Sequence, residues 1–317
     1  MDHHLHATAE TVRWGHWDGS LAPALVIKSG DTVTIDTLSG EPDDLPDPLS
    51  NFEILPEHRQ VLSAGKDGPG PHFLTGPIAI EGARPGDVLE VRIHEIKLRQ
   101  NWGWNLQAPL KGTLPEDFPE LRRMVVLLDR ERNIAKLPWG QEISLNPFFG
   151  NFGVAPPVGW GRLSSKEPRP FGGNMDNKEL VAGSTVYFPV FVDGALFSAG
   201  DGHALQGDGE VCLTAIETAL SGTLEFVLRR DFGLAVPRAE TEQIWITMGF
   251  DEDLDDAAKQ ALREMIRLIT ELTGLSAQDA YTLCSIASDL RVTQMVNLIK
   301  GVHCVIVKEK LPGLIKR

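Results

Sequence analysis

The sequence has few cysteines, only two tyrosines, fewer basic than acidic residues and no long apolar run. Its three cysteines are too scattered for a disulfide framework or a zinc knuckle, which favours a reducing compartment. Because no run approaches the roughly eighteen apolar residues of a membrane-spanning helix, we expect no membrane span. The N-terminal residues MDHHLHATAE also lack the basic start and apolar core of a signal peptide. These absences together predict a cytoplasmic protein.

The charge balance is acidic, with 44 aspartate and glutamate residues against 30 lysine and arginine residues and a net charge of −14. Such a surface repels phosphate backbones, so nucleic-acid binding is disfavoured. It also makes a site for a metal cation easier to build. The 317 residues, 42% of them hydrophobic, are enough for one large globular domain or two to three small ones.

Short alternating apolar runs predict β-structure through the first 235 residues. Three segments, 24–38, 76–98 and 184–201, each read as two strands joined by a tight turn, and 222–230 adds another strand. Many short strands separated by glycine and proline are typical of a sandwich or barrel. We therefore expect an α+β fold that is mainly β, with a β-sandwich or barrel body over residues 1–235 that carries most of the active site.

The pattern changes after about residue 240. Residues 242–250 predict a strand, and apolar residues spaced three and four apart over 254–272 predict an amphipathic helix. Ser276 then opens a second helix, 292–299 predicts a third short helix, and 303–309 predicts a closing strand. Residues 236–317 are accordingly expected to form a smaller α/β C-terminal part.

The segment SAGDGHALQGDGEVCLTAIE, residues 198–217, concentrates acidic side chains and glycines. Residues two apart on a strand point to the same face, so Asp201 should point with His203, and Asp208 with Glu210. Close carboxylates raise each other's pKa unless a cation or proton lies between them. The mixed oxygen and nitrogen donors suit a divalent metal such as zinc. The alternative is a solvated hairpin whose carboxylates cap turn amides.

A second candidate site is FGGNMDN, residues 171–177. Asn174 and Asp176 are again two apart, and the paired glycines before them, including Gly173, indicate backbone open to a ligand. An asparagine amide can donate a hydrogen bond to a developing oxyanion. The alternative is a plain Gly-Asn turn.

Other segments give weaker signals. NWGWN at 101–105 could wall a pocket or be a packed loop, and the histidines near the N-terminus are expected to be solvent-exposed. The run 164–166 contains Ser-Ser-Lys, but three adjacent residues do not make a catalytic triad. Cys284 lies on the apolar face of a predicted helix, where we expect a buried, inert thiol.

Several long blocks resemble the acetamidase/formamidase family. They are TVRWGHWDGSLAPALVIKSGDTV, LTGPIAIEGARPGDVLEVRI, GNFGVAPP, the long block from GGNMDNKEL to GDGHALQGDGEV, and SIASDLRVTQMVN. The resemblance extends from about residue 3 to residue 310, and Phe171 stands where the family pattern has a polar residue. It implies a β-rich fold, hydrolysis of formamide or acetamide, and metal dependence in at least some members. With the exposed edges of a β-rich body, it also implies a homodimer or larger homo-oligomer.

The chemistry of amide hydrolysis gives these residues expected roles. Asp201 and His203 are expected to bind a divalent metal, zinc before calcium, with Asp176 as a third ligand. Glu210 is the expected proton shuttle, Asn174 the residue that orients the amide or stabilises its oxyanion, and Gly173 and Asp208 the residues that contact substrate. Two rivals stay open: a non-catalytic binding protein on the same fold, and an amidase with a cysteine or serine nucleophile.

Overall fold

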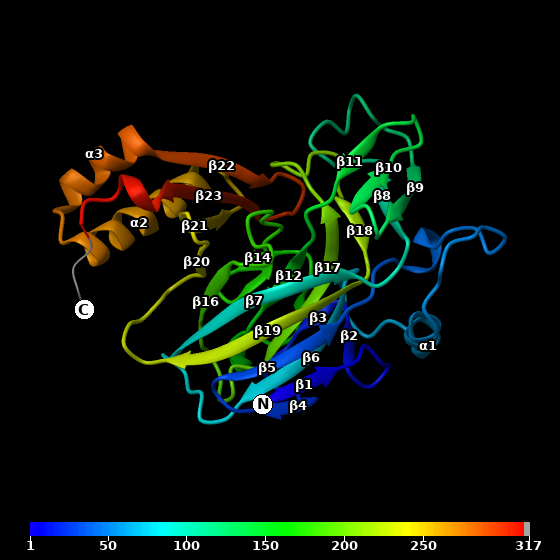
Figure 1. Ribbon diagram of the computed structural model, residues 1–317, viewed down its shortest axis with the longest axis horizontal. Helices are drawn as coiled ribbons and strands as arrows, with labels where there is room; N and C mark the ends of the chain where they lie inside the picture. Colours follow the sequence, from blue (N-terminus) through cyan, green and yellow to red (C-terminus); the bar gives the residue numbers. More distant parts are fainter. Residues whose placement is uncertain (314–317) are drawn as a thin grey trace.

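The structure is a computed structural model that describes residues 1–313, and it is mainly β (Figure 1). Two large sheets form the body. The nine-stranded sheet has the order β1-β5-β19-β7-β16-β20-β21-β23-β22. Its strands are β1 (Asp2–Leu5), β5 (Asp31–Asp36), β7 (Val88–Leu98), β16 (Thr185–Pro189), β19 (Leu220–Arg229), β20 (Arg238–Glu240), β21 (Ile244–Asp251), β22 (Ser288–Gln294) and β23 (Lys300–Val307).

The twelve-stranded sheet has the order β11-β10-β9-β8-β18-β17-β12-β15-β14, with β6 pairing to β17 and carrying β2 and β4. Its strands are β2 (Val12–Trp14), β4 (Leu25–Ile27), β6 (Phe73–Ile80), β8 (Trp102–Gln107), β9 (Arg122–Asp129), β10 (Ile134–Lys136), β11 (Glu142–Ser144), β12 (Phe148–Gly153), β14 (Pro168–Arg169), β15 (Gly172–Asn174), β17 (Phe197–Leu205) and β18 (Ile216–Thr218). A small two-stranded sheet joins β3 (His16–Trp17) to β13 (Leu163–Ser164).

The main core lies between the two sheets. Phe152 and Phe197 of the twelve-stranded sheet lie with their ring centroids 6.2 Å apart, and both rings pack against Phe188 of the nine-stranded sheet. Leu89 and Val91, which alternate with charged residues along β7, are fully buried in the same core. The expected mainly-β fold is confirmed, and the sheets of the described residues form no closed barrel.

The three predicted strand pairs are wrong as pairings, although their strands exist. In each case the two strands belong to different sheets: β4 and β5, β6 and β7, and β16 and β17. β4 pairs with β6, for example, whereas β5 pairs with β1 and β19. The turn residues allow the chain to reverse, but each reversal crosses the core to the opposite sheet. Burial of both apolar faces decides this choice.

Three α-helices are present among residues 1–313: α1 (Pro56–Ala64), α2 (Leu254–Thr273) and α3 (Ala277–Ala287). Short 3₁₀ turns lie at η1 (Pro42–Asp44), η2 (Val158–Trp160) and η3 (Lys308–Lys310). α2 begins where Asp253 accepts bonds from the amides of Asp255 and Asp256, and it ends at Gly274, whose φ is 74°. None of these helices combines the length and apolarity that crossing a bilayer requires.

The C-terminal part continues the nine-stranded sheet beyond residue 235. α2 and α3 lie beside β21, β22 and β23 (Figure 1), where Met265, Cys284 and Cys304 share a second apolar core. The predicted helix over 292–299 is wrong. Val292–Gln294 extend β22 against β23, and the Gln294 side chain then accepts bonds from the amides of Val296 and Asn297, which forms a turn. The division at residue 235 stays a prediction.

Candidate active site

Adjacent strands of the twelve-stranded sheet supply the centre of the site. On β17, Asp201 and His203 are two residues apart, and Glu217 on β18 lies directly across from His203. The Nε2 atom of His203 lies 3.5 Å from Asp201 Oδ2 and 3.2 Å from Glu217 Oε2. All three side chains are almost completely buried. The period of two along a strand therefore brings the expected aspartate and histidine together.

Two loops bring further carboxylates to the same imidazole. Asp176 follows β15, and its amide donates to the Gly150 carbonyl at 3.0 Å. Glu210 lies in the turn after β17, next to Gly209, whose amide donates to the Thr293 carbonyl at 3.1 Å. One oxygen from Asp176, one from Glu210 and a nitrogen of His203 lie within 4.8 Å of one another. The site thus gathers two Asp/Glu pairs around His203.

The orientation of His203 is set by a neighbouring amide. Its Nδ1 atom lies 2.8 Å from Gln206 Oε1, and the Gln206 Nε2 group donates to the Asp176 carbonyl at 2.7 Å. Because Gln206 Oε1 can only accept, the Nδ1 atom carries the proton. Nε2 therefore faces the carboxylates, as in a histidine that uses one nitrogen as a ligand and fixes the other through a hydrogen bond.

Three of the site acids adopt a left-handed backbone. The φ angles are 49° at Asp176, 55° at Asp201 and 46° at Glu210. This region is uncommon for residues other than glycine and costs on the order of 1–3 kcal/mol for each residue. The surrounding pairing and turns hold this strain at the positions where carboxylates must point toward His203.

Burial and close charges shift the ionisation of the cluster. Burial, reinforced by neighbouring carboxylates, raises the pKa of Asp176, Glu210 and Glu217. Burial alone would also raise the pKa of Asp201, but His72 and His203 hold it well below its usual range. Burial alone would lower the pKa of His203, but Glu217 and Asp201 raise it. So much buried negative charge requires protons or a cation.

The donor atoms fit a divalent cation. Two ligands that each lie about 2.1 Å from a tetrahedral ion are about 3.4 Å apart. The distances from His203 Nε2 to Asp201 Oδ2 and to Glu217 Oε2, 3.5 and 3.2 Å, are close to this separation. His72 Nε2 lies 3.6 Å from Asp201 Oδ2, and Asp176 Oδ1 lies 3.9 Å from His203 Nε2. Asp176 Oδ1 and Glu217 Oε2 are buried and accept no hydrogen bond. The residues present therefore suit a cation with oxygen and nitrogen ligands.

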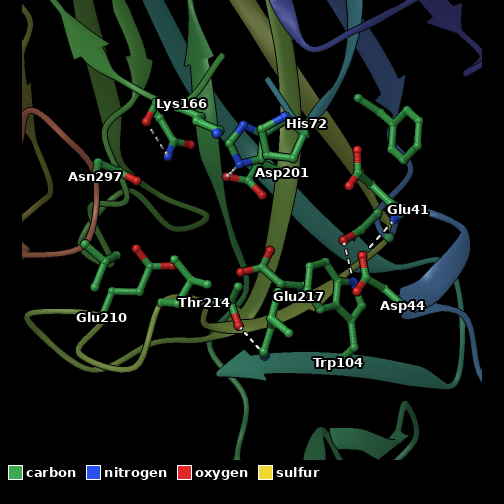
Figure 2. A pocket seen from close by; sticks show the side chains of 18 of the residues that line it. Glu41, Asp44, His72, Trp104, Lys166, Asp201, Glu210, Thr214, Glu217 and Asn297 are labelled. Atoms are coloured by element: carbon green, nitrogen blue, oxygen red, sulfur yellow. Dashed lines mark hydrogen bonds and ion pairs between the residues drawn. The ribbon is translucent and has the colours of Figure 1, made fainter. Parts of the chain in front are cut away.

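A cavity of about 440 Å³ opens onto this cluster. Figure 2 shows Asp201, Glu217 and Glu210 directed into it, with His72 beside Asp201 and Trp104 on the opposite wall. Trp104 comes from the NWGWN segment, whose other tryptophan, Trp102, is fully buried. The segment therefore both walls the cavity and packs in the core.

The residues of the 171–177 segment differ in their access to the cavity. Asn174 lines it, and its Nδ2 group donates to the Lys166 carbonyl at 3.2 Å while its buried Oδ1 atom has no partner. Gly173 is buried in β15 with a φ of 82°, and it is not among the residues that line the cavity. Phe171 is fully buried against Trp17, so an apolar contact occupies the position that is polar in the family pattern.

Asp208 lies apart from the other acids of its segment. It is exposed and forms an ion pair of 2.8 Å with Lys178, and it does not line the cavity. The turn around Gly207 and Gly209 rotates Glu210 inward while Asp208 remains outside. Its expected contact with substrate stays a prediction that this position does not favour.

Two residues of the site carried no role in the sequence analysis. Glu217 lies in the same segment as Asp201, but only the register between β17 and β18 puts it opposite His203. His72 precedes β6, far away in the sequence, and its spacing to the other site residues follows no motif. The one local signal was for Glu217, because it is an acidic residue at the end of the acid-rich segment 198–217. No local signal indicated His72.

The other candidates from the sequence, His4, His6, Cys284 and Ser165, do not line the cavity. His4 and His6 are partly exposed and both bond to Asp36 Oδ2, at 2.8 and 3.0 Å, and the three side chains could hold an ion. Cys284 is buried, and burial raises the pKa of its thiol. Ser165 is fully buried, with its Oγ atom 2.9 Å from His72 Nδ1.

Solved structures resemble this chain over nearly all of its length. An acetamidase from Bacillus halodurans is 32% identical with a TM-score of 0.82, and the match covers 97% of this chain and 99% of that one. An acetamidase from Yersinia enterocolitica is 29% identical with a TM-score of 0.86, and the match covers 98% of this chain and 93% of that one.

A formamidase from Methylophilus methylotrophus is 30% identical over 200 residues, or 47% of this chain and 49% of that protein. The match thus spans about half the length of this relative. The model of the Acetamidase/Formamidase family matches residues 2–159 and 164–311. The resemblance inferred from the sequence is confirmed, and the chain belongs to the acetamidase/formamidase family.

Proposed function

We propose that this protein is an amidohydrolase that cleaves short aliphatic amides, acetamide or formamide, to ammonia and a carboxylate. The observation that carries the proposal is the convergence of His203 with buried carboxylates at the floor of a cavity. A plain scaffold gains nothing from this cluster, because each buried carboxylate costs stability unless it is paired. Family membership and the names of the similar proteins support the same activity.

The cation proposed for the site is divalent, with zinc preferred to calcium because calcium sites use oxygen ligands and this cluster centres on an imidazole. Asp201, His203 and Glu217 would hold it, with Asp176 and His72 next in reach. A bound divalent cation polarises an amide carbonyl and lowers the pKa of a water ligand to about 7. This proposed set adds Glu217 and His72 to the ligands expected from the sequence, Asp201, His203 and Asp176.

Glu210 is proposed to move the proton. It lines the cavity beside Asp176, and burial raises the pKa of its carboxyl, so it holds a proton more readily than an exposed glutamate does. Glu210 takes a proton from the attacking water as the carbon–oxygen bond forms, and it delivers that proton to the nitrogen as the carbon–nitrogen bond breaks. Ammonia leaves, and the acyl group leaves as the carboxylic acid, which then gives its proton to ammonia or water and becomes the carboxylate.

Asn174 is proposed to orient the substrate. Its Nδ2 group donates a hydrogen bond to the Lys166 carbonyl, and this bond fixes the orientation of the Asn174 side-chain amide. Its buried Oδ1 atom is free to accept a hydrogen bond from the NH₂ group of a primary amide. This geometry supports the orienting role over the alternative of an oxyanion donor.

The test compares His203→Ala and Glu210→Gln with the parent protein for bound metal and for ammonia release from acetamide and formamide. His203→Ala should lose metal and activity together. Glu210→Gln should keep the metal and lower kcat by roughly 10²–10⁴-fold. Asp289→Asn, at an exposed position on β22, serves as the control and should change neither. Full activity in both site variants would refute the proposed site.

A serine nucleophile is the second candidate, because Ser165 Oγ, His72 and Asp201 form a connected series of 2.9 and 3.6 Å contacts. Ser165 is fully buried and does not line the cavity, which favours the water mechanism over this one. Ser165→Ala separates the two. It should retain turnover if water attacks, and it should abolish turnover if the serine does.

We also propose a cytoplasmic homodimer or larger homo-oligomer. Large apolar side chains are exposed on α3 and on the edge strand β22, namely Tyr281, Ile286 and Leu290. Contact between copies would cover these side chains and the strand edge. Light scattering at micromolar concentration tests this assembly, and a monomeric mass would refute it.

A further inference from the structure

The cavity is much larger than the substrates in the family name require. Its volume is about 440 Å³, whereas one water occupies about 30 Å³ in the liquid. Acetamide has only four non-hydrogen atoms, so it would fill a small part of this space. Cavities of roughly 300–1,000 Å³ usually take ligands much larger than acetamide. The remaining volume has room for a substrate larger than acetamide.

One wall of the cavity is apolar and held in place. Trp104 and Leu106 come from β8, and Leu38 and Phe73, which belong to one apolar cluster, also line the cavity. The Trp104 indole donates to Ser39 Oγ at 3.1 Å, and the Leu106 amide donates to Thr214 Oγ1 at 2.8 Å. The wall is thus fixed before any ligand enters. In Figure 2, Trp104 lies across the cavity from His72 and Asp201.

A second apolar surface lies next to a residue that contacts the carboxylate cluster. Asn297 donates to Asp176 Oδ2 at 2.7 Å, and its neighbours Val296 and Leu298 line the cavity. Leu298 is 67% exposed, which places it at the mouth. An apolar chain that extends from the carboxylate cluster would therefore meet an apolar surface on its way to the opening.

The turn that carries Glu210 also carries an apolar group. The Leu213 amide donates to the Glu210 carbonyl at 3.1 Å, and Leu213 lines the cavity with a φ of 124°. Leucine rarely adopts such a backbone, and strain of this kind is concentrated at ligand sites. The same short turn thus places an apolar side chain beside the carboxylate proposed to move the proton.

Two of the acidic residues that line the cavity, Glu41 and Asp44, are paired with basic residues. Glu41 forms an ion pair with Lys66 at 2.7 Å, and Asp44 forms one with Arg123 at 3.1 Å. Both acids are thereby neutralised by partners. Lys111 and Lys166 also line the cavity, so a ligand with an anionic end is the alternative that the test must separate.

We infer that the preferred substrate is a primary amide with an apolar acyl chain or ring longer than that of acetamide. This inference rests on the proposed amidase function. The amide end lies at the cluster around His203, and the apolar end lies against Trp104, Leu106 and Leu213. Burial of each further methylene group stabilises the bound state, because apolar surface leaves water.

The experiment measures kcat/KM for formamide, acetamide, butyramide and hexanamide, and for the monoamide of adipic acid. We expect kcat/KM to rise about four-fold for each methylene until the apolar wall is covered. Hexanamide should exceed the adipic monoamide, which has a carboxylate at the far end. A flat or falling series with measurable acetamide turnover would overturn the inference and leave the amidase proposal intact, as would a faster adipic monoamide. Absence of turnover on every amide would refute the amidase proposal and this inference with it.

Two substitutions test whether the apolar end of the substrate contacts Leu106 and Leu298. Leu106→Trp fills the inner wall, and Leu298→Asp places a charge at the exposed mouth, where it leaves the core intact. Both should lower the ratio of hexanamide to acetamide kcat/KM, by about ten-fold for Leu106→Trp. Leu49→Trp, at an exposed position that does not line the cavity, is the matched control and should leave the ratio unchanged. An unchanged ratio in both wall variants would overturn the assignment.

Discussion

Gly150 on β12 lies so close to His203 on the neighbouring β17 that no side chain fits between them. A Cβ atom at position 150 would lie 2.7 Å from His203 Nε2 and 2.6 Å from Asp176 Oδ1. On either side of Gly150, Phe149 and Asn151 pair with Gly202 and Gly200 of β17, so β12 cannot easily retreat. The glycine therefore leaves the space in which His203 and Asp176 approach each other.

Gly150→Ala should reduce metal content and amide turnover together. The added methyl group must displace His203 or Asp176, and displacing groups that orient metal ligands typically costs about 10–100-fold in affinity or activity. Elemental analysis and ammonia release on the same sample measure both. Gly159→Ala is the control, because a Cβ atom there meets nothing within 4 Å. Parent-level metal binding in Gly150→Ala would contradict the geometry.

Removing the free acceptor of Asn174 should weaken substrate use. We expect Asn174→Ala to lower kcat/KM for acetamide by about 10–100-fold, since the amide NH₂ would lose a buried partner. Bound metal should remain, because Asn174 is not a proposed ligand. Asn51→Ala, at an exposed position, is the control. If metal is lost together with activity, Asn174 instead maintains the structure of the cluster.

His303 should make the fold less stable as the pH falls. Burial lowers its pKa to about 4, from an ordinary value of about 6.5. Its stabilising contribution is fully present above pH 6.5, where both states are neutral, and is lost between pH 6.5 and 4 as only the unfolded state gains the proton. The loss reaches on the order of 3 kcal/mol. Urea unfolding at several pH values should therefore show a shallower decline in His303→Gln than in the parent protein.

Cation binding should release protons from the site. Burial raises the pKa of Asp176, Glu210 and Glu217, so the metal-free cluster holds protons near pH 6.5 that a divalent cation would displace. Calorimetric titration of the metal-free protein with zinc, in two buffers of different ionisation enthalpy, counts them. We expect release of at least one proton, and more at pH 6.5 than at pH 8.5. Binding without proton release would show that the carboxylates are already ionised.

The two C-terminal helices, α2 and α3, were predictable from local sequence alone. The stripe of apolar residues and the residues at its ends specify α2, because Asp253 caps its start and only glycine readily takes the left-handed backbone at 274. The Asp201–His203 pair was equally accessible, since residues two apart on a strand are expected to share a face. The family blocks could also be read from the sequence, and they identified the family to which the chain belongs.

Strand pairing was not predictable in this way. A Gly-containing turn reverses the chain whether the next strand returns to its own sheet or crosses to the other, so β4 and β5 looked like a hairpin. For the same reason, the sequence did not show that Glu217 and His72 belong to the site. Register across strands and contacts over long sequence separations depend on which apolar faces bury each other, and that is a property of the whole core.

The sequence by itself determined one part of the site: a histidine with acids two and seven residues away, and glycines that let the chain bend between them. The tertiary structure alone decided which acids face His203, turning Glu210 inward and leaving Asp208 with Lys178 at the surface. The physical reason is that side-chain direction in a turn follows from backbone angles, here the left-handed φ of 46° at Glu210. The bonds from Gly209 to Thr293 and from Met295 to Gly209, made to a strand far along the chain, hold that turn.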